Sequence, residues 1–157
     1  MSDLLILFSA KYLIFFLFLP LIYFWFRGER KLVFCTLASV LLAEVLALLV
    51  EALFPTPRPF VVFGIAPPPV FFLRVQTGSF PSGHTAVGVA LAVSVMLKRK
   101  IWGRFLLLLA LIVGVARVLT SAHFWWDILG GIVIGWLCAH LVNRIHQAKS
   151  AKLQCKV

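Results

Sequence analysis

Polar residues suited to anion chemistry gather in three short stretches of this otherwise apolar sequence. The stretches are Pro57-Arg58-Pro59-Phe60, Pro81-Ser82-Gly83-His84-Thr85, and Arg117 through His123 to Asp127. Guanidinium groups bind phosphate oxygens, and an imidazole can attack phosphorus or pass a proton to a departing oxygen. If the fold brings the three stretches together, they can form a site for phosphoryl transfer.

The second stretch stands immediately before an apolar run that predicts a helix. The first backbone N–H groups of a helix have no intrahelical partner, so this end of the helix can bind phosphate. Ser82 alone is typical of a helix N-cap, which is the simpler interpretation. His84, two residues later, favours a functional interpretation, because its imidazole can protonate a leaving oxygen beside the bound anion.

The third stretch contains His123 and Asp127, which are four positions apart and so lie on one face of a helix. A carboxylate there can hold one imidazole N–H and leave the other nitrogen free to attack phosphorus. Arg117 can neutralise the oxygens of the same phosphate. The neighbouring Trp125 and Trp126 leave a second interpretation open, in which His123 is a membrane-interface anchor. Arginine, histidine and aspartate together at a membrane edge are harder to explain as anchors.

The elements that position these residues must lie in a membrane. Of the 157 residues, 62% are hydrophobic and 13% are charged, a composition that excludes a soluble globular domain. The formal net charge of +10 does not indicate a nucleic-acid-binding protein, because the cations fall in short segments between long apolar runs. We therefore expect an all-α, polytopic membrane helix bundle that forms one domain over residues 1–157.

Five apolar segments of the sequence predict about five transmembrane helices. They run roughly over residues 4–26, 32–50, 85–97, 105–120 and 124–142. The third segment is short for a membrane span, and we expect its helix to begin at Ser82. Gly131 and Gly135 in the fifth segment, and Gly88 with Ala92 in the third, have the spacing of small residues that lets two helices pack closely.

Cations mark one side of the predicted membrane domain. They lie between the first and second segments, between the third and fourth, and after the fifth: Arg27, Arg30, Lys31, Lys98, Arg99, Lys100, Arg104, Arg144, Lys149, Lys152 and Lys156. By the positive-inside rule, these regions face the cytoplasm, and the three polar stretches face the other side. We also expect Lys11 and Glu44, which lie at a similar depth, to form an ion pair between the first two helices, unless Lys11 extends to the interface instead.

The stretch 54–80 combines many prolines with Phe60, Phe63, Phe71 and Phe72. Proline prevents a regular spanning helix, yet the aromatic side chains are too apolar for a well-solvated loop. We expect this stretch to lie in the membrane interface as a cap over the outer ends of the helices. An ordinary packed connection is the alternative.

The three polar stretches together resemble the signature of the type 2 phosphatidic acid phosphatase superfamily, over residues 51–127. The apolar composition is similar to that of its membrane lipid phosphatases rather than its soluble members. The resemblance implies that His123 is the nucleophile, Asp127 orients it and His84 is the general acid. The phosphate-binding residues implied in the same way are Arg58, Ser82, Gly83 and Arg117. No metal or other cofactor is implied.

The sequence departs from this signature at two positions. Glu51 stands where the family usually has a lysine, and we expect it to turn away from the phosphate, toward Arg74. Ala116 stands where the family usually has a serine before Arg117, which removes one possible hydrogen bond. Both departures concern phosphate binding and leave the nucleophile in place.

This short sequence, with five predicted spans and without that lysine, resembles the small bacterial undecaprenyl-diphosphate phosphatases of the bacitracin-resistance type. The resemblance implies a phosphatase of the bacterial inner membrane that hydrolyses undecaprenyl diphosphate through a phosphohistidine, with its site on the extracytoplasmic side. Lipid A, phosphatidylglycerophosphate and phosphatidic acid phosphatases are the alternatives, and a non-catalytic protein that binds anionic lipids is the alternative of another class. The expected partners are the lipid substrate and the bilayer, without nucleic acid. The sequence does not indicate an oligomeric state.

Overall fold

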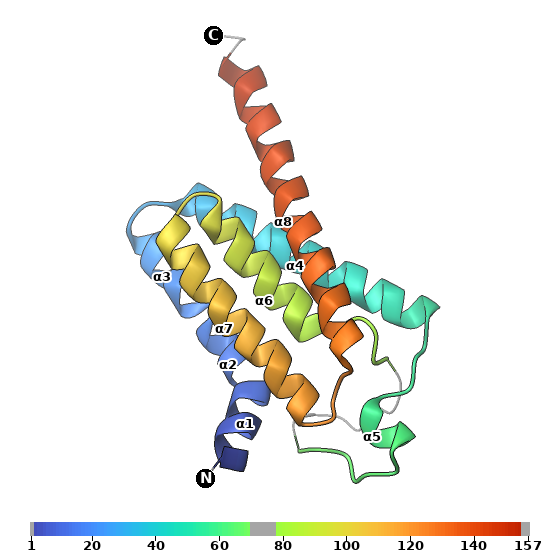
Figure 1. Ribbon diagram of the computed structural model, residues 1–157. Helices are drawn as coiled ribbons and strands as arrows, with labels where there is room; N and C mark the ends of the chain where they lie inside the picture. Colours follow the sequence, from blue (N-terminus) through green and yellow to red (C-terminus); the bar gives the residue numbers. More distant parts are fainter. Residues whose placement is uncertain (1, 70–77, 155–157) are drawn as a thin grey trace.

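The computed structural model describes residues 2–69 and 78–154, and in these residues the chain is helical and contains no strand (Figure 1). The helices are α1 (Ser2–Lys11), α2 (Leu13–Phe16), α3 (Leu19–Phe26), α4 (Arg30–Leu53), α5 (Pro59–Val62), α6 (Gly83–Met96), α7 (Lys100–Leu119) and α8 (Trp125–Gln154). The prediction of an all-α bundle is confirmed.

Helix α6 is the core of the bundle. It packs against α4, α7 and α8, and most of its residues are buried. Figure 1 shows it beside these longer helices. Its 14 residues rise about 21 Å, less than the ~30 Å hydrocarbon core of a bilayer. The helix begins where the sequence predicts, because the Ser82 hydroxyl accepts a hydrogen bond from the Thr85 N–H and so caps it.

Within residues 2–69 and 78–154, three helices are long and apolar enough to cross a membrane, namely α4, α7 and, over Trp125–Ser150, α8. The first predicted segment adds a fourth span if its halves, Leu4–Lys11 and Leu13–Phe26, are counted together, although they bend by 54°. Pro20 lies in the first turn of α3, where its missing N–H separates this helix from α2. All five predicted segments are thus helical, but three or four of them, rather than five, qualify as spans by length and hydropathy.

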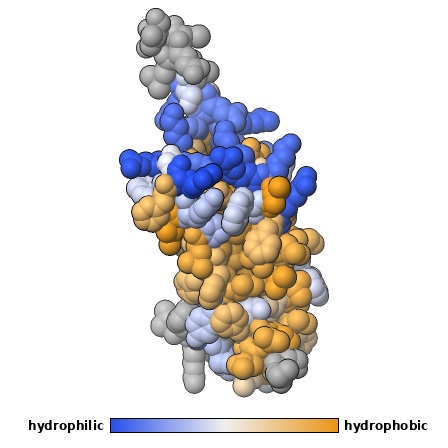
Figure 2. Space-filling model, turned by 90° about the vertical axis from the view of Figure 1, so that its left-hand side faces the viewer, coloured by the Kyte–Doolittle hydropathy of each residue, from blue (hydrophilic) through white to orange (hydrophobic). Residues whose placement is uncertain are grey.

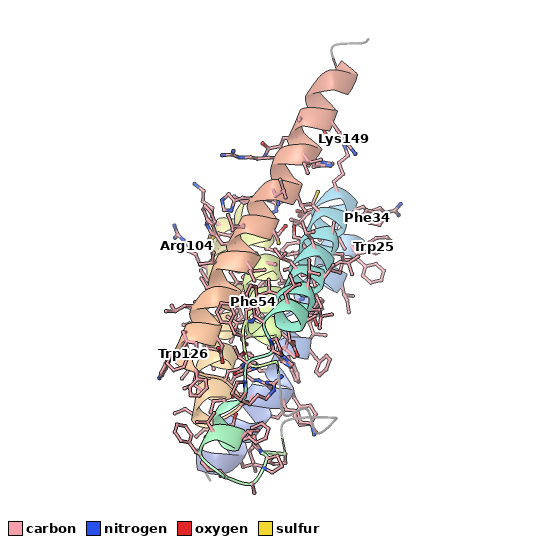
Figure 3. All side chains as sticks on the ribbon, turned by 90° about the vertical axis from the view of Figure 1, so that its right-hand side faces the viewer. Trp25, Phe34, Phe54, Arg104, Trp126 and Lys149 are labelled. Atoms are coloured by element: carbon pink, nitrogen blue, oxygen red, sulfur yellow. The ribbon has the colours of Figure 1, made fainter. Side chains whose placement is uncertain are left out.

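Large apolar side chains cover the outside of the bundle. Phe34 on α4 is 61% exposed and Leu129 on α8 is 63% exposed, and many similar residues accompany them. Figure 2 shows a hydrophobic band below hydrophilic residues at one end of the molecule. In Figure 3, Lys149 and Arg104 lie toward that end, and Trp126 lies toward the other. Such a surface requires a lipid environment, so the chain is an integral membrane protein.

The described part of the proline-rich stretch, residues 54–69, packs on the connection between α7 and α8. The Phe60 N–H donates to the Ser121 carbonyl at 3.2 Å. The rings of Phe63 and Phe124 meet edge to face, with their centres 6.2 Å apart. This part therefore covers the end of the bundle at the α7–α8 connection. Its place in a membrane interface stays a prediction, and the remainder of the predicted cap lies partly outside the described residues.

The predicted ion pair between Lys11 and Glu44 is wrong. Because the first segment is bent, α1 packs mainly against α7 rather than α4. The Lys11 ammonium donates to the Pro69 carbonyl at 3.3 Å. The Glu44 carboxylate lies instead beside Gly83, at the start of α6. Lys11 therefore lies at the proline-rich stretch and Glu44 lies at the start of α6.

The predicted close packing at glycines of α8 is confirmed. A Cβ atom at Gly131 would lie 2.7 Å from the Ser82 carbonyl oxygen, and a Cβ atom at Gly135 would overlap the Ala86 carbonyl oxygen. The absence of side chains at these positions lets α8 approach the backbone of α6.

Gly135→Ala should destabilise the bundle, because the new methyl group must push α8 away from the backbone of α6. We expect a loss of about 1–3 kcal/mol in the free energy of unfolding. The measurement is the thermal unfolding midpoint of the purified protein in detergent. Val133→Ala, at an exposed position of the same helix, is the control and should change the midpoint little. An unchanged midpoint in Gly135→Ala would contradict the close approach of the two helices.

Candidate active site

His123 lies in the short connection between α7 and α8. The N–H groups of Ala122 and His123 both donate to the Arg117 carbonyl, at 3.0 and 3.2 Å. Ser121 has a φ of 55°, in the left-handed region, which helps the chain to reverse within a few residues. This tight connection holds His123 next to the last turn of α7, from which the Arg117 side chain extends.

Both ring nitrogens of His123 have partners that define the position of its proton. Nδ1 lies 2.7 Å from the Ser79 carbonyl oxygen, which can only accept a hydrogen bond. Nε2 lies 3.2 Å from Arg58 Nη1 and 3.4 Å from Arg117 Nη2, which can only donate. We therefore assign the proton to Nδ1, and the lone pair of Nε2 faces the two guanidinium groups.

The two guanidinium groups are buried together with this imidazole. Arg58 is 6% exposed, Arg117 2% and His123 3%. Backbone carbonyls hold both cations in place: Arg58 Nη1 donates to Ala122 at 3.2 Å, and Arg117 Nη1 donates to Ala10 at 3.4 Å. Two fixed cations beside an imidazole form an arrangement suited to a doubly charged phosphate group.

Asp127 acts on the imidazole less directly than the sequence suggests. Its Oδ2 lies 3.6 Å from His123 Nδ1, whose proton is directed at the Ser79 carbonyl instead. The same carboxylate oxygen accepts hydrogen bonds from the Ser79 hydroxyl at 2.5 Å and from the Phe124 N–H at 2.7 Å. Asp127 therefore positions Ser79, which in turn holds the ring, and it also caps the start of α8.

Ser79 belongs to the cluster although its place in the sequence does not predict this. Its hydroxyl donates to Asp127 and its carbonyl accepts from His123, so two of its polar groups serve the cluster, while its N–H donates to the Thr56 carbonyl. Its position three residues before Ser82 is the only sequence signal that points to it.

The start of α6 joins the same cluster. The Ser82 N–H donates to the Asp127 carbonyl at 3.0 Å, which ties α6 to α8. The Ser82 hydroxyl accepts a hydrogen bond from the Thr85 N–H at 3.5 Å, as expected of an N-cap, and a second one from the Thr85 hydroxyl at 3.0 Å. His84 is half-buried and lies within electrostatic range of His123 and of both arginines. The structure thus brings together the three stretches that the sequence singles out.

Two carboxylates border the cluster on the side of α4. Glu44 lies beside Gly83, whose Cβ, if present, would be 3.3 Å from Glu44 Oε2. Glu51 interacts electrostatically with Arg58. The expected turn of Glu51 toward Arg74 stays a prediction, because Arg74 lies outside the described residues. Within those residues, no group of three or more histidine, cysteine, aspartate or glutamate side chains is arranged to hold a metal ion.

The environment of His123 keeps its imidazole neutral. Burial is the main cause that lowers the pKa of His123 to about 4, and Arg117 and Arg58 act in the same direction. Asp127 and Ser79 raise the pKa but do not reverse the shift. At neutral pH the ring therefore carries no charge, which is the state in which Nε2 can act as a nucleophile.

Comparisons with known proteins match both the sequence and the fold. The model of the PAP2 superfamily matches residues 28–151. The putative undecaprenyl-diphosphatase YbjG of Escherichia coli is 30% identical over 152 residues, which cover 94% of this chain and 75% of the relative. The undecaprenyl-diphosphatase BcrC of Bacillus subtilis is 26% identical over 145 residues, covering 90% of this chain and 74% of the relative. The crystal structure of Aquifex aeolicus LpxE has a TM-score of 0.76 and 26% identity, over 91% of this chain and 86% of that one.

The low pKa of His123 should make the folded state less stable in acid. As the pH falls below the ordinary value of 6.5, the unfolded chain binds a proton at this histidine, whereas the folded chain does so only near pH 4. Stability present above pH 6.5 should therefore be lost between about pH 6.5 and 4, at up to about 1.4 kcal/mol per pH unit. The measurement is the thermal midpoint as a function of pH.

His123→Gln should show a smaller fall of the midpoint with pH, because glutamine does not titrate. His140→Gln is the control and should follow the wild-type curve, since His123 is retained. If the wild type and His123→Gln lose stability equally, the neutral, buried state of His123 is refuted.

Proposed function

Because the chain belongs to the PAP2 superfamily, we propose that this membrane phosphatase removes the terminal phosphate of undecaprenyl diphosphate, with His123 as the nucleophile. Two of its curated relatives carry the name undecaprenyl-diphosphatase, which supports this lipid as the substrate. The assignment of the nucleophile rests on one observation. The lone pair of His123 Nε2 faces two buried arginines that can hold a phosphate.

In the first step, His123 Nε2 attacks the terminal phosphorus. A phosphate bound by Arg58 and Arg117 takes over the N–H groups that are directed at Nε2 in the free protein, and so releases its lone pair. The N–P bond forms while the bond from phosphorus to the bridging oxygen breaks, and that oxygen takes a proton from His84. In the free protein, burial first and the two arginines second disfavour the protonated form of His84. The negative charge of the bound phosphate acts in the opposite direction and favours that form.

Ser79 and Asp127 support this step from the other side of the ring. The Ser79 carbonyl keeps the proton on Nδ1, and the Asp127 charge stabilises the cationic ring that forms once Nε2 is phosphorylated. In the second step, water attacks phosphorus and gives a proton to His84, while the N–P bond breaks and its electron pair returns to Nε2. The products are inorganic phosphate and undecaprenyl phosphate, and both histidines are restored.

We further propose that the protein lies in the bacterial inner membrane with this cluster on the extracytoplasmic side. Most of the cations lie in the α3–α4 and α6–α7 connections, in the first turns of α4 and α7 that follow them, and in the second half of α8. These segments lie at the end of the bundle away from the α7–α8 connection, which carries His123 (Figure 1). The positive-inside rule assigns that end to the cytoplasm. The lipid tail then remains in the bilayer, and its head group reaches the cluster at the outer interface.

His123→Ala should abolish phosphate release from undecaprenyl diphosphate, because the attacking atom is removed. We expect a loss of roughly 10³-fold or more. The measurements are inorganic phosphate release and the labelling of the protein by substrate with a radioactive terminal phosphate. His140→Ala is the matched control and should retain activity, since this histidine on α8 packs against the ring of Trp136, away from the cluster. Near-normal turnover by His123→Ala would refute the assignment.

The same assay with lipid A, phosphatidylglycerophosphate and phosphatidic acid tests the substrate. The fastest release from undecaprenyl diphosphate would support the proposal, whereas a preference for another lipid would replace it with that alternative. Binding of these lipids without release of phosphate from any of them would identify a non-catalytic lipid-binding protein.

Phe63→Cys and Lys149→Cys should differ in their reaction with a membrane-impermeant maleimide on intact cells. Both side chains are exposed, the first on the connection beside His123 and the second near the other end of α8. In a background in which Cys35, Cys138 and Cys155 are replaced by serine, only Phe63→Cys should react before the cells are permeabilised. The reverse pattern would invert the proposed orientation.

A further inference from the structure

A positively charged cavity lies at the end of the bundle away from His123. It has a volume of about 620 Å³ and lies between the first turn of α4, the α6–α7 connection and α8. Its walls include four cations, Arg30, Lys31, Lys98 and Arg99, but a single carboxylate, Glu29. A cavity of this size and charge can hold the anionic part of a small ligand.

The charges in this cavity are not evenly balanced. Glu29 accepts two hydrogen bonds from Arg99, at 2.9 and 2.7 Å, so the charges of these two residues neutralise each other. Arg30 lies over the ring of Trp25, 5.4 Å from its centre, at the edge of the cavity. Lys31 and Lys98 are left to supply the charge that a bound anion would meet.

The cavity also opens on the N-terminus of α4. Residues from Gly28 to Leu32 line it, and the side chain of the N-cap residue, Glu29, makes no hydrogen bond to the first turn. The first N–H groups of this 24-residue helix are therefore available to an anion, and the helix dipole favours a negative charge there. Backbone donors and two ammonium groups thus converge on one place.

An apolar groove continues from the cavity along the outside of the bundle. It has a volume of about 290 Å³ and shares Lys31, Cys35 and His146 with the cavity. From these residues it runs between α4 and α8 as far as Ala38 and Val142. At 1.5 Å per residue, this is a length of about 10 Å.

The walls of the groove change from charged to apolar along its length. Lys149 lines it near the charged end, and Phe34 lines it farther into the hydrophobic band. Figure 3 shows both side chains on the same side of the molecule. A ligand that occupies the cavity and the groove must therefore have a charged head and an apolar tail.

We propose that the cavity and the groove together bind one anionic phospholipid of the surrounding bilayer. Its phosphodiester lies in the cavity against Lys31, Lys98 and the first turn of α4, and one acyl chain lies in the groove. A nucleic acid or a free phosphate ion would leave the apolar groove unused. The bound lipid joins α4 to α8 and to the α6–α7 connection, and it is not a substrate, because it lies at the opposite end from His123.

The test uses the purified full chain in a neutral detergent. The protein is titrated with dioctanoyl phosphatidylglycerol, dioctanoyl phosphatidylcholine or inorganic phosphate, and binding is followed by native mass spectrometry and by the thermal midpoint. We expect phosphatidylglycerol to bind and to raise the midpoint, and phosphatidylcholine to do neither. The double variant Lys31→Ala/Lys98→Ala should bind phosphatidylglycerol ~10- to 30-fold more weakly.

The double variant Arg104→Ala/Arg144→Ala is the matched control. It removes the same charge from the same part of the bundle, but neither residue lines the cavity or the groove. It should bind phosphatidylglycerol as the wild type does. The catalytic cluster is intact in both double variants, so the difference between them reports on the cavity alone. Equal weakening in both, or no binding by the wild type, would overturn the proposal.

Ala38→Phe tests the position of the acyl chain, because the larger side chain fills the groove. In this variant, phosphatidylglycerol should raise the thermal midpoint no more than inorganic phosphate does. Leu37→Phe changes an exposed neighbour that does not line the groove. In this control, phosphatidylglycerol should still raise the midpoint more than inorganic phosphate does. The proposal fails if inorganic phosphate raises the midpoint of the wild type as much as phosphatidylglycerol does, or if Ala38→Phe binds the lipid normally. The site would then hold an anion only.

Discussion

The burial of two guanidinium groups beside one imidazole is the constraint on which the rest of the structure depends. Charged groups in an apolar bundle are costly unless polar atoms surround them. Here the carbonyls of Ala10 and Ala122 accept from the arginines, and Glu51 and Asp127 contribute opposite charge. These partners come from α1, the α7–α8 connection, α4 and α8. Elements that are distant in sequence must therefore meet at one end of the bundle.

Helix α6 makes this meeting possible because the other helices pack around it. Its first turn brings Ser82 and His84 to the cluster, and the hydrogen bond from the Ser82 N–H to the Asp127 carbonyl joins it to α8. That contact requires two helix backbones to approach closely, which the glycines of α8 allow. The geometry of the site thus depends on residues that have no chemistry of their own.

The sequence predicts the helices and the members of the cluster because this information is local. The length of an apolar run indicates a membrane helix, and Ser82 before such a run indicates its start. Contacts that depend on the path of a connection could not be predicted. Ser79 serves the site through a backbone carbonyl, which has no signature in the sequence. The pairing of Lys11 with Glu44 failed because equal depth does not determine which helices are neighbours, and the bend in the first segment turned α1 toward α7.

The length of α8 has a consequence for how the whole molecule is held in place. Its 30 residues extend about 45 Å, well beyond the ~30 Å hydrocarbon layer. The surplus protrudes from the bundle in Figure 1 and carries Lys149 and Lys152. Sliding the molecule along the bilayer normal toward its other face would drag these cations into hydrocarbon, at a cost of roughly 2.5–3.5 kcal/mol for each one that reached the centre. The protruding turns therefore resist this displacement. They fix the depth at which the opposite end of the molecule meets the lipid head groups.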